Sequence, residues 1–416
     1  MTTTPNLTKL SQRSCPESFF DLTETIAASA GCGPDRSFER LDEAVERTPG
    51  FLHETLPFIW KEALGAPRIL PDLPLLASAS AARLTQRQCL CVLSNAFFCT
   101  FTERPSYNCL GGPDLPSINF DELYGGNGWG SVEVAKLRML FRYFEEMRER
   151  RAGGDDLARG ITFTRREATN SSAVDWEQCD KPLLKPVVHA LGQSLDEAKN
   201  MFRVDFANRI VGGAAIAYGC VQEEIMFCEC PEMIVSRLFC PIMTANEAIV
   251  IVGAEQFSQH TGYAGSLRYE GRYRDRSSID NGALCSHVVA IDALDLRSGG
   301  KERQYTDSMI LRELTKAWAG FDVPDAPTDL ATGNWGCGVF GGDAELKSIL
   351  QWLACSRANK SMNYFPFDNK EVFQQLPGLA EGLIARGTTV GTLARFLLRE
   401  LEPGGAYGQL AGEFLR

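Results

Sequence analysis

The sequence of 416 residues is poor in histidine, in paired cysteines and in long apolar runs. Only four histidines are present, and the 14 cysteines include no Cys-X-X-Cys pair, so no zinc ligand set is apparent. Cysteines spread through a long chain in this way are typical of reduced thiols rather than of a disulfide framework. We therefore expect no metal ion and no cofactor.

Apolar residues make up 44% of the chain, but no run approaches the roughly 20 apolar residues of a membrane-spanning helix. The N-terminus MTTTPNLTKLSQRSCPESFF also lacks the continuous apolar stretch of a secretion signal. These absences predict a soluble protein that is neither secreted nor bound to a membrane.

The charge balance is acidic: 42 Lys and Arg against 53 Asp and Glu give a formal net charge of −11. Such a chain repels DNA and RNA at long range unless positive charge is concentrated locally. We therefore expect no direct DNA binding.

The chain divides by pattern into a helical accessory region, residues 1–155, and an α/β region, residues 156–416. In the first region Thr85 to Gln88 has the S/T-x-x-E/Q pattern of a capping box, and a second amphipathic helix begins near Ser131 and ends before Gly153. From about residue 160, short β-rich runs alternate with helical patterns. The predicted strands span 161–164, 201–206, 248–252, 287–291 and 362–367, and the predicted helices 308–319, 344–356 and 390–401.

A glycine-rich segment, GNWGCGVFGGD, holds five glycines between Gly333 and Asp343, directly before a predicted helix with Asp343 as its N-cap. Glycines let the backbone approach a ligand closely, and the helix start offers free N–H groups. Such a loop can hold a diphosphate without Lys or Arg, which suits an acidic protein. It is not a Walker A loop, and a tightly packed turn is an equal alternative on this segment alone.

A second cluster gathers acids, amides and glycines between Asp205 and Glu224, after a predicted strand. Consecutive residues diverge by about 100° on a helix, so Glu223 and Glu224 are poor candidates for two carboxyls facing each other across one bond. We expect one to transfer the proton and its neighbour to orient the substrate. A solvated acidic pair is the alternative.

Three segments together resemble the catalytic region of the poly(ADP-ribose) glycohydrolase family. They are VDFANRIVGGAAIAYGCVQEEIMF, GAEQFSQHTGYA and ATGNWGCGVFGGDAELK, and the likeness extends from about residue 84 to about residue 367. The resemblance implies a macrodomain-like mixed sheet with helices on both faces, an N-terminal all-α accessory region, and C-terminal helices. One departure is visible, because Ala214 stands where the family usually has a third glycine.

The resemblance also implies a role for each matching residue. Glu224 matches the catalytic acid/base, Glu223 the neighbour that positions the ribose, and Asp205 a residue that supports both. The implied binding residues are Asn208, Gly212 and Gly213 near the ribose; Gln222 of the signature; Gly336, Cys337, Gly338, Val339 and Phe340 in the diphosphate loop, with the Phe340 ring near the distal ribose; Tyr263 near the adenine and phosphates; and Phe367 and Asp196 at the adenine. On residue type alone, both Phe367 and Tyr263 are as readily explained as packing or surface residues.

The implied function is hydrolysis of ribose–ribose bonds in poly(ADP-ribose), mainly from the chain end, with release of ADP-ribose. The implied partners are poly(ADP-ribose), ADP-ribose and poly(ADP-ribosyl)ated proteins, and the expected setting is a monomer in the nucleus or cytoplasm, in the DNA damage response. A non-catalytic ADP-ribose reader is the main alternative because macrodomains serve both purposes. Removal of single ADP-ribose groups from proteins is a third.

Overall fold

The computed structural model describes residues 5–31, 36–73, 75–102, 115–126 and 128–416. The chain packs into two compact units, and three segments form each of them. The first unit comprises residues 1–163, 210–242 and 251–285, and the second comprises residues 164–209, 243–250 and 286–416. The segment that carries the predicted acid pair therefore packs with the N-terminal helices. The boundary between residues 155 and 156 stays a prediction.

The first unit is built mainly from helices. Its α-helices are α1 (Phe19–Ala30), α2 (Glu39–Glu46), α3 (Leu56–Leu64), α4 (Ala66–Ile69), α5 (Gln86–Phe97), α6 (Asp121–Tyr124), α7 (Ser131–Ala152) and α9 (Gln222–Glu229). The unit also has a π-helix, η1 (Phe51–Thr55), and two 3₁₀ helices, η3 (Pro231–Leu238) and η4 (Ala264–Ser266). The predicted capping box is confirmed, because the N–H of Gln88 donates to Oγ1 of Thr85 at 3.2 Å while the N–H of Thr85 donates to Oε1 of Gln88 at 2.8 Å. Helix α7 also begins and ends where the pattern predicts.

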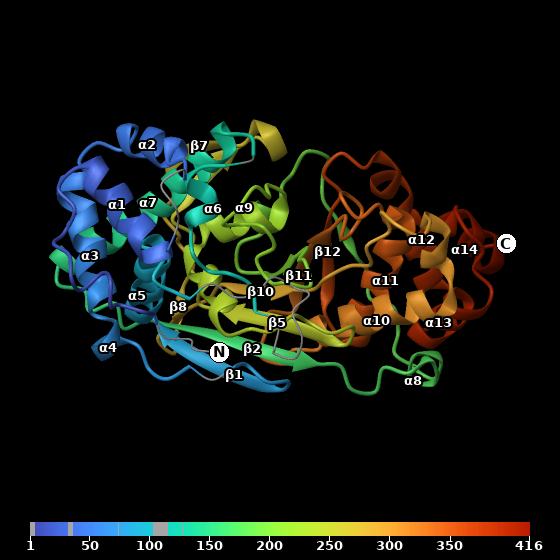
Figure 1. The fold of residues 1–416 in the computed structure, drawn as a ribbon. Helices are drawn as coiled ribbons and strands as arrows, with labels where there is room; N and C mark the ends of the chain where they lie inside the picture. Colours follow the sequence, from blue (N-terminus) through green and yellow to red (C-terminus); the bar gives the residue numbers. More distant parts are fainter. Residues whose placement is uncertain (1–4, 32–35, 74, 103–114, 127) are drawn as a thin grey trace. The chain divides into compact units, whose positions relative to one another are not determined.

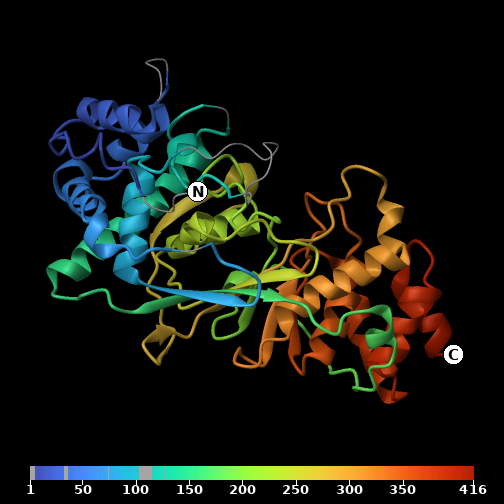
Figure 2. The ribbon, with the colours of Figure 1, turned by 60° about the horizontal axis from the view of Figure 1, so that its bottom comes forward.

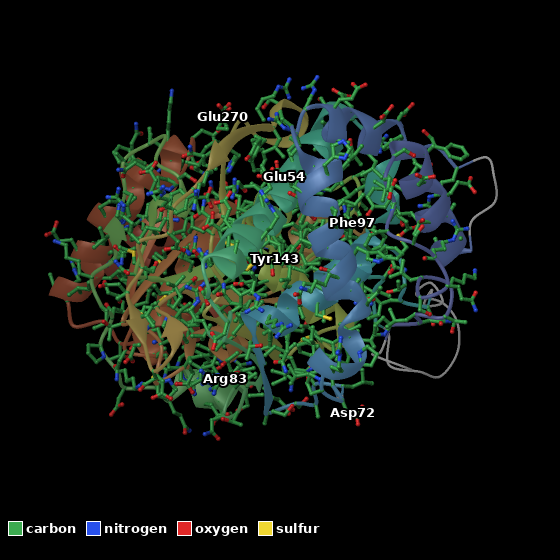
Figure 3. The ribbon with its side chains drawn as sticks, turned by 90° about the vertical axis from the view of Figure 1, so that its left-hand side faces the viewer. Glu54, Asp72, Arg83, Phe97, Tyr143 and Glu270 are labelled. Carbon is green, nitrogen blue, oxygen red and sulfur yellow. The ribbon has the colours of Figure 1, made fainter. Side chains whose placement is uncertain are left out.

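Aromatic side chains fill the core between these helices. Phe51 stacks on Phe141 with ring centroids 4.0 Å apart, and the ring of Tyr143 meets Phe257 at 4.9 Å. Figure 3 labels Phe97 on α5 and Tyr143 on α7, both fully buried. The tight packing of these rings fixes α7, which also carries residues that contact the acid-pair segment.

A buried ionic network crosses the same unit. Glu255 pairs with Arg150 at 2.6 Å and with Arg159, while Glu232 accepts hydrogen bonds from Nε2 of Gln86 at 2.7 Å and from the N–H of Glu255 at 3.0 Å. Burial, followed by the nearby charge of Glu255, raises the pKa of Glu232 to about 7. Glu255, the acidic residue of the GAEQFSQH motif, therefore has a structural role in this interior network.

Eight strands form the main sheet. They are β1 (Ser80–Thr85), β2 (Gly160–Glu167), β3 (Val187–Val188), β4 (Phe202–Asp205), β5 (Glu247–Val252), β10 (His287–Ala290), β11 (Asp329–Gly333) and β12 (Ser361–Phe365), in the order β1-β2-β5-β10-β4-β11-β12-β3. The pairs β10–β4, β4–β11, β11–β12 and β12–β3 are parallel. Two small antiparallel ladders, β6 (Ser258–Thr261) with β7 (Arg268–Arg272) and β8 (Ile279–Asp280) with β9 (Ala283–Leu284), belong to the first unit.

Each predicted strand is confirmed within one to three residues at its ends. Strand β5 is buried along nearly its whole length, as its apolar pattern predicts for a central strand. Strand β1, which lies beside β2 in Figure 2, was not predicted, because its sequence SAARLT has too little apolar alternation. It interrupts the otherwise helical N-terminal region.

The second unit combines most of this sheet with further helices. These are α8 (Ala173–Glu177), α10 (Asp307–Phe321), α11 (Ala344–Arg357), α12 (Lys370–Ala385), α13 (Val390–Arg399) and α14 (Ala406–Phe414), with the short turns η2 (Leu195–Glu197) and η5 (Lys301–Tyr305). Helices α10 to α14 gather as the orange and red part of Figure 1, and the predicted helices at α10, α11 and α13 are confirmed. The whole is a mixed α/β fold.

Two further findings concern the described residues alone. Twelve cysteines lie within them, and all twelve are free thiols. Among the described helices none has both the length and the apolarity to cross a membrane.

Candidate active site

The acid pair lies in the first turn of α9, where negative side chains are favoured by the helix dipole. Glu224, at the third helical position, accepts a hydrogen bond on Oε2 from the N–H of Val221 at 2.9 Å. Its other oxygen, Oε1, accepts from the N–H of Ala214 at 3.1 Å. Glu223 Oε1 accepts from the N–H of Gly212 at 2.7 Å. Both glutamates are buried, at 2% and 7% exposed, so the backbone fixes two carboxylates that water scarcely reaches.

Gly213 lies between these two carboxylates. A Cβ atom placed on it would lie 2.4 Å from Oε1 of Glu224 and 2.6 Å from Oε2 of Glu223, and its φ is +44°. Adjacent side chains on a helix diverge, yet these two bend toward the same glycine. Position 213 therefore requires glycine for two reasons: its backbone has a positive φ, and a side chain there would collide with the two carboxylates.

Neighbouring positions in the loop have different requirements. Gly212 has φ of +84°, and a Cβ atom there would lie 2.9 Å from the ring of Phe227. Ala214 is not among the residues with positive φ, so its backbone does not require glycine. Its methyl group lies against Gly219, which explains how alanine is accommodated where the family pattern has glycine.

Two buried cations that sequence reasoning missed bind the carbonyls of residues 212–219, called here the 212–219 loop. Nζ of Lys136, on α7, donates to the carbonyls of Ala214, Ala217 and Gly219 at 3.2, 2.6 and 2.6 Å. Nη1 of Arg237, in η3, donates to the carbonyl of Gly213 at 2.7 Å. The sequence did hold a signal for Lys136. It lies at helical spacing from Val132, Met139 and Tyr143, which are all buried, and this spacing places the lysine on the buried face of the helix.

Tyr263 belongs to the same unit as the acid pair. It is 48% exposed at the start of η4, and its N–H donates to Oγ of Ser266 at 2.9 Å. The next residue, Ala264, donates its N–H to the carbonyl of Cys220 at 3.1 Å, two residues before Gln222. The structure thus brings Tyr263 into the neighbourhood of Gln222, the half-buried first residue of α9.

The remaining predicted residues lie in the second unit, in segments that follow its parallel strands. Asp205 ends β4 and is fully buried, and the half-buried Asn208 follows three residues later. Strands β11 and β12 end beside each other, with Gly333 paired to Phe365. Ligands of open parallel sheets bind at this edge, so the sheet gathers these segments where a ligand crevice is expected.

The glycine-rich loop between β11 and α11 is firmly anchored. Trp335 is fully buried and donates Nε1–H to the carbonyl of Ile291 at 2.9 Å, while Asn334 donates Nδ2–H to the carbonyl of Pro366 at 2.9 Å. Gly336 has φ of +73°, and a Cβ atom there would lie 2.4 Å from Cβ of Ala293. Asp343 caps α11 as predicted, accepting from the N–H of Leu346 at 2.8 Å. The loop is thus shaped by its anchors.

The middle of this loop faces outward. Gly338 and Val339 are exposed, the latter by 57%, and Phe340 is half-buried beneath Arg297, whose guanidinium carbon lies 5.5 Å from the ring centre. Burial raises the pKa of the Cys337 thiol, which therefore stays neutral. A neutral thiol fits a contact residue of the loop better than a nucleophile.

Phe367 does not end a strand, because β12 stops at Phe365. It has φ of +56° and is 52% exposed, so it is not a core residue. Its carbonyl accepts the N–H of Gly192 at 2.7 Å, four residues before Asp196. Asp196 is half-buried in η2, and its Oδ2 accepts a hydrogen bond from Oγ of Ser194 at 2.8 Å. The unit therefore holds an exposed ring and a carboxylate on adjoining segments.

A cavity of about 310 Å³ lies next to the end of the glycine-rich loop. Its lining includes Lys301, Tyr305, Gly341 and Asp343, but none of the predicted site residues. Within the described ranges, no group of three or more His, Cys, Asp or Glu side chains is placed so that it could hold a metal ion.

Comparison with known proteins identifies the family of both regions. A family model described as "Poly (ADP-ribose) glycohydrolase (PARG), helical domain" matches residues 44–165. A second, described as "Poly (ADP-ribose) glycohydrolase (PARG), Macro domain fold", matches residues 173–374.

Proteins named poly(ADP-ribose) glycohydrolase are similar to this chain in sequence. Poly(ADP-ribose) glycohydrolase 1 of Arabidopsis thaliana is 33% identical over 389 residues, covering 76% of this chain and 68% of that protein. Poly(ADP-ribose) glycohydrolase 1 of Caenorhabditis elegans is 32% identical over 348 residues, covering 78% of this chain and 41% of that protein.

Two solved structures are also similar to part of the chain. The poly(ADP-ribose) glycohydrolase of Thermomonospora curvata aligns over 53% of this chain and 85% of its own, with 13% identity and a TM-score of 0.35. The enzyme of Deinococcus radiodurans, solved in complex with ADP-ribose, aligns over 56% and 94%, with 13% identity and a TM-score of 0.30.

Proposed function

The chain belongs to the poly(ADP-ribose) glycohydrolase family, and from this premise we propose that it hydrolyses the ribose–ribose O-glycosidic bonds of poly(ADP-ribose), mainly in exo mode, releasing ADP-ribose. The observation that carries the proposal is the pair Glu223 and Glu224, buried at the start of α9 and held by the N–H groups of Gly212 and Ala214. Such an arrangement suits proton transfer, because a general acid must be fixed at one place relative to the bond it cleaves.

In the proposed reaction Glu224 begins protonated and donates this proton to the oxygen of the leaving ribose as the glycosidic C–O bond breaks. The distal ribose then has oxocarbenium character. A water molecule attacks the anomeric carbon and returns a proton to Glu224, which restores the acid for the next cycle. Glu223 binds the distal ribose and holds its anomeric carbon within reach of Glu224.

Other residues of the chain are proposed to bind the diphosphate and the adenine. Backbone N–H groups of the glycine-rich loop at residues 336–340 bind the diphosphate, which explains how an acidic chain retains an anionic ligand. Phe367 stacks on the adenine, and Asp196 accepts hydrogen bonds from it. The 52% exposure of residue Phe367 supports this role, since a stacking platform must have one free face.

The experiment compares wild-type protein with Glu224→Gln and a matched control, Glu270→Gln. Glu270 is an exposed glutamate on β7 in the same unit, visible at the surface in Figure 3. Each protein is incubated with automodified poly(ADP-ribose), and ADP-ribose release is followed by chromatography. We expect Glu224→Gln to lose about 10²- to 10⁴-fold in turnover while its affinity for ADP-ribose, measured by calorimetry, stays within about threefold.

The product pattern decides the finer assignments. Exo hydrolysis releases monomeric ADP-ribose from the first minutes, whereas internal cleavage produces oligomers first. Near-normal hydrolysis by a folded Glu224→Gln variant removes Glu224 from the role of acid/base. Wild-type protein that binds ADP-ribose but releases none from the polymer is instead the non-catalytic reader.

A further inference from the structure

The contacts of the 212–219 loop are divided between its two kinds of backbone group. Its N–H groups at Gly212 and Ala214 face the acid pair. Four of its carbonyl groups, those of Gly213, Ala214, Ala217 and Gly219, accept hydrogen bonds from two buried cations, Lys136 at 0% exposed and Arg237 at 6% exposed. One side of the loop therefore orients the carboxylates, and the other is held by positive charge.

A single peptide group connects the two sides most directly. The peptide between Gly213 and Ala214 accepts a hydrogen bond from Nη1 of Arg237 on its carbonyl at 2.7 Å and donates its N–H to Oε1 of Glu224 at 3.1 Å. A trans peptide is planar, and its C=O and N–H point in opposite directions. Fixing the carbonyl on Arg237 therefore fixes the direction of the N–H that binds Glu224.

Lys136 holds the next part of the loop. Its three ammonium protons are matched by three carbonyl acceptors, those of Ala214, Ala217 and Gly219, so the charge is fully hydrogen-bonded. Arg237 has a second anchor outside the loop, because Nε donates to the carbonyl of Ser117 at 2.9 Å. The guanidinium is thus held at two points and cannot follow the loop if the loop shifts.

Burying two cations lowers the stability of the folded state unless their hydrogen bonds compensate for the lost hydration. Removing a charge from water is unfavourable, and apolar residues of similar volume often stabilise a fold as well or better. Lys136 lies on the buried face of α7, between the apolar Val132 and Met139. The retained charge therefore indicates a task beyond filling the core.

We propose that Lys136 and Arg237 are positioning residues for the hydrolytic step: through the carbonyls of the 212–219 loop they set the orientation of Glu224 without touching the substrate. The inference rests on the proposed function and deepens it. It also assigns a part in catalysis to the helical region, because Lys136 lies within residues 44–165, whereas Glu224 lies within residues 173–374.

The test uses Lys136→Met, Arg237→Lys and a matched control, Lys360→Met. Lys360 is also a buried lysine, 4% exposed, and donates to two backbone carbonyls, those of Ala326 and Pro327, at 3.2 and 3.1 Å. It precedes β12, at the amino end of the parallel strands and not at the carboxyl end. All variants are compared for melting temperature, kcat and KM on poly(ADP-ribose), and affinity for ADP-ribose.

We expect kcat to fall by about 10²-fold in Lys136→Met, since displacements near 1 Å at a reacting group have this effect, while KM and ADP-ribose affinity stay within about threefold. Arg237→Lys keeps the charge but cannot serve both the Gly213 and Ser117 carbonyls, and we expect a fall of about tenfold in kcat. Lys360→Met is expected to lose thermal stability and keep kcat within about threefold.

Hydrogen exchange separates this inference from the proposed function. Peptides that cover residues 212–219 should exchange faster in Lys136→Met and at the wild-type rate in Lys360→Met, and this readout needs no substrate. Wild-type protein that fails to hydrolyse the polymer defeats the proposed function, and the exchange rates still decide whether the cations hold the loop.

Three outcomes overturn the inference. One is a folded Lys136→Met protein with kcat within about threefold of wild type, and another is an equal loss of kcat in Lys136→Met and Lys360→Met. If Lys136→Met does not fold, Arg237→Lys decides, and wild-type kcat in that variant also overturns the inference.

Discussion

Gly213→Ala is the substitution whose effect the structure defines most sharply. The new methyl carbon would lie 2.4 Å from Oε1 of Glu224 and 2.6 Å from Oε2 of Glu223. Ordinary nonbonded separation is about 3.5 Å, so each carboxylate oxygen must retreat by about 1 Å or the loop must move by as much. Either change breaks the arrangement in which the N–H groups of Gly212 and Ala214 bind the pair.

The magnitude has two parts. A positive φ of +44° costs an alanine about 1 kcal/mol of folding free energy relative to glycine. Displacement of a reacting group by about 1 Å costs on the order of 10²-fold in rate. We therefore expect kcat/KM on poly(ADP-ribose) to fall by about 10²-fold or more, with a modest loss of stability.

Gly387→Ala is the matched control. Gly387 also has a positive φ, +69°, but a Cβ atom there meets nothing within 4 Å. It should lose a similar amount of stability and no activity. Chromatographic assays and thermal melts on both variants separate backbone strain from displacement of the carboxylates. A folded Gly213→Ala protein with activity within about threefold of wild type would refute the reasoning.

Two further predictions concern the first unit. The pKa of Glu232 is about 7 in the folded state, against an ordinary value of 4.5. Between these pH values the folded state therefore binds a proton that the unfolded state has lost. The stability gained from this proton, of the order of 3 kcal/mol, is lost as the pH rises from about 4.5 to about 7. Unfolding in urea across this range should show a decline that Glu232→Gln reduces; equal slopes in both proteins would contradict the assignment. Ala214→Gly should lose about 0.5–1 kcal/mol of stability through backbone entropy and keep kcat/KM within about threefold, because Ala214 has no positive φ. A large gain in activity would show instead that the methyl group obstructs the site.

Local sequence patterns predicted the elements that carry the site. The capping box at Thr85, the apolar run of β5 and the N-cap at Asp343 each depend on neighbouring residues and are present as expected. Strand β1 was missed, because this edge strand has a weak apolar pattern. The end of β12 was placed at Phe367 and not at Phe365, because a strand ends where its pairing with the neighbouring strand stops.

Other features required long-range packing. Nothing in the spacing of Lys136 and Glu224, 88 positions apart, shows that α7 meets the loop that orients the acid pair. The sequence also did not predict that Glu223 and Glu224 converge on Gly213. Adjacent side chains on a helix point in different directions, and these two come together only because both contact the loop around Gly213, which lies outside the helix.

The sequence by itself determined which chemical groups this protein has: two adjacent glutamates, glycines at the turns, a glycine-rich loop before a helix, and motifs that identify the family. Tertiary structure alone decided how these groups are held. A carboxylate is oriented by the backbone donors around it, those donors are oriented by cations on their far side, and the partners in that chain of contacts come from segments that only folding brings together.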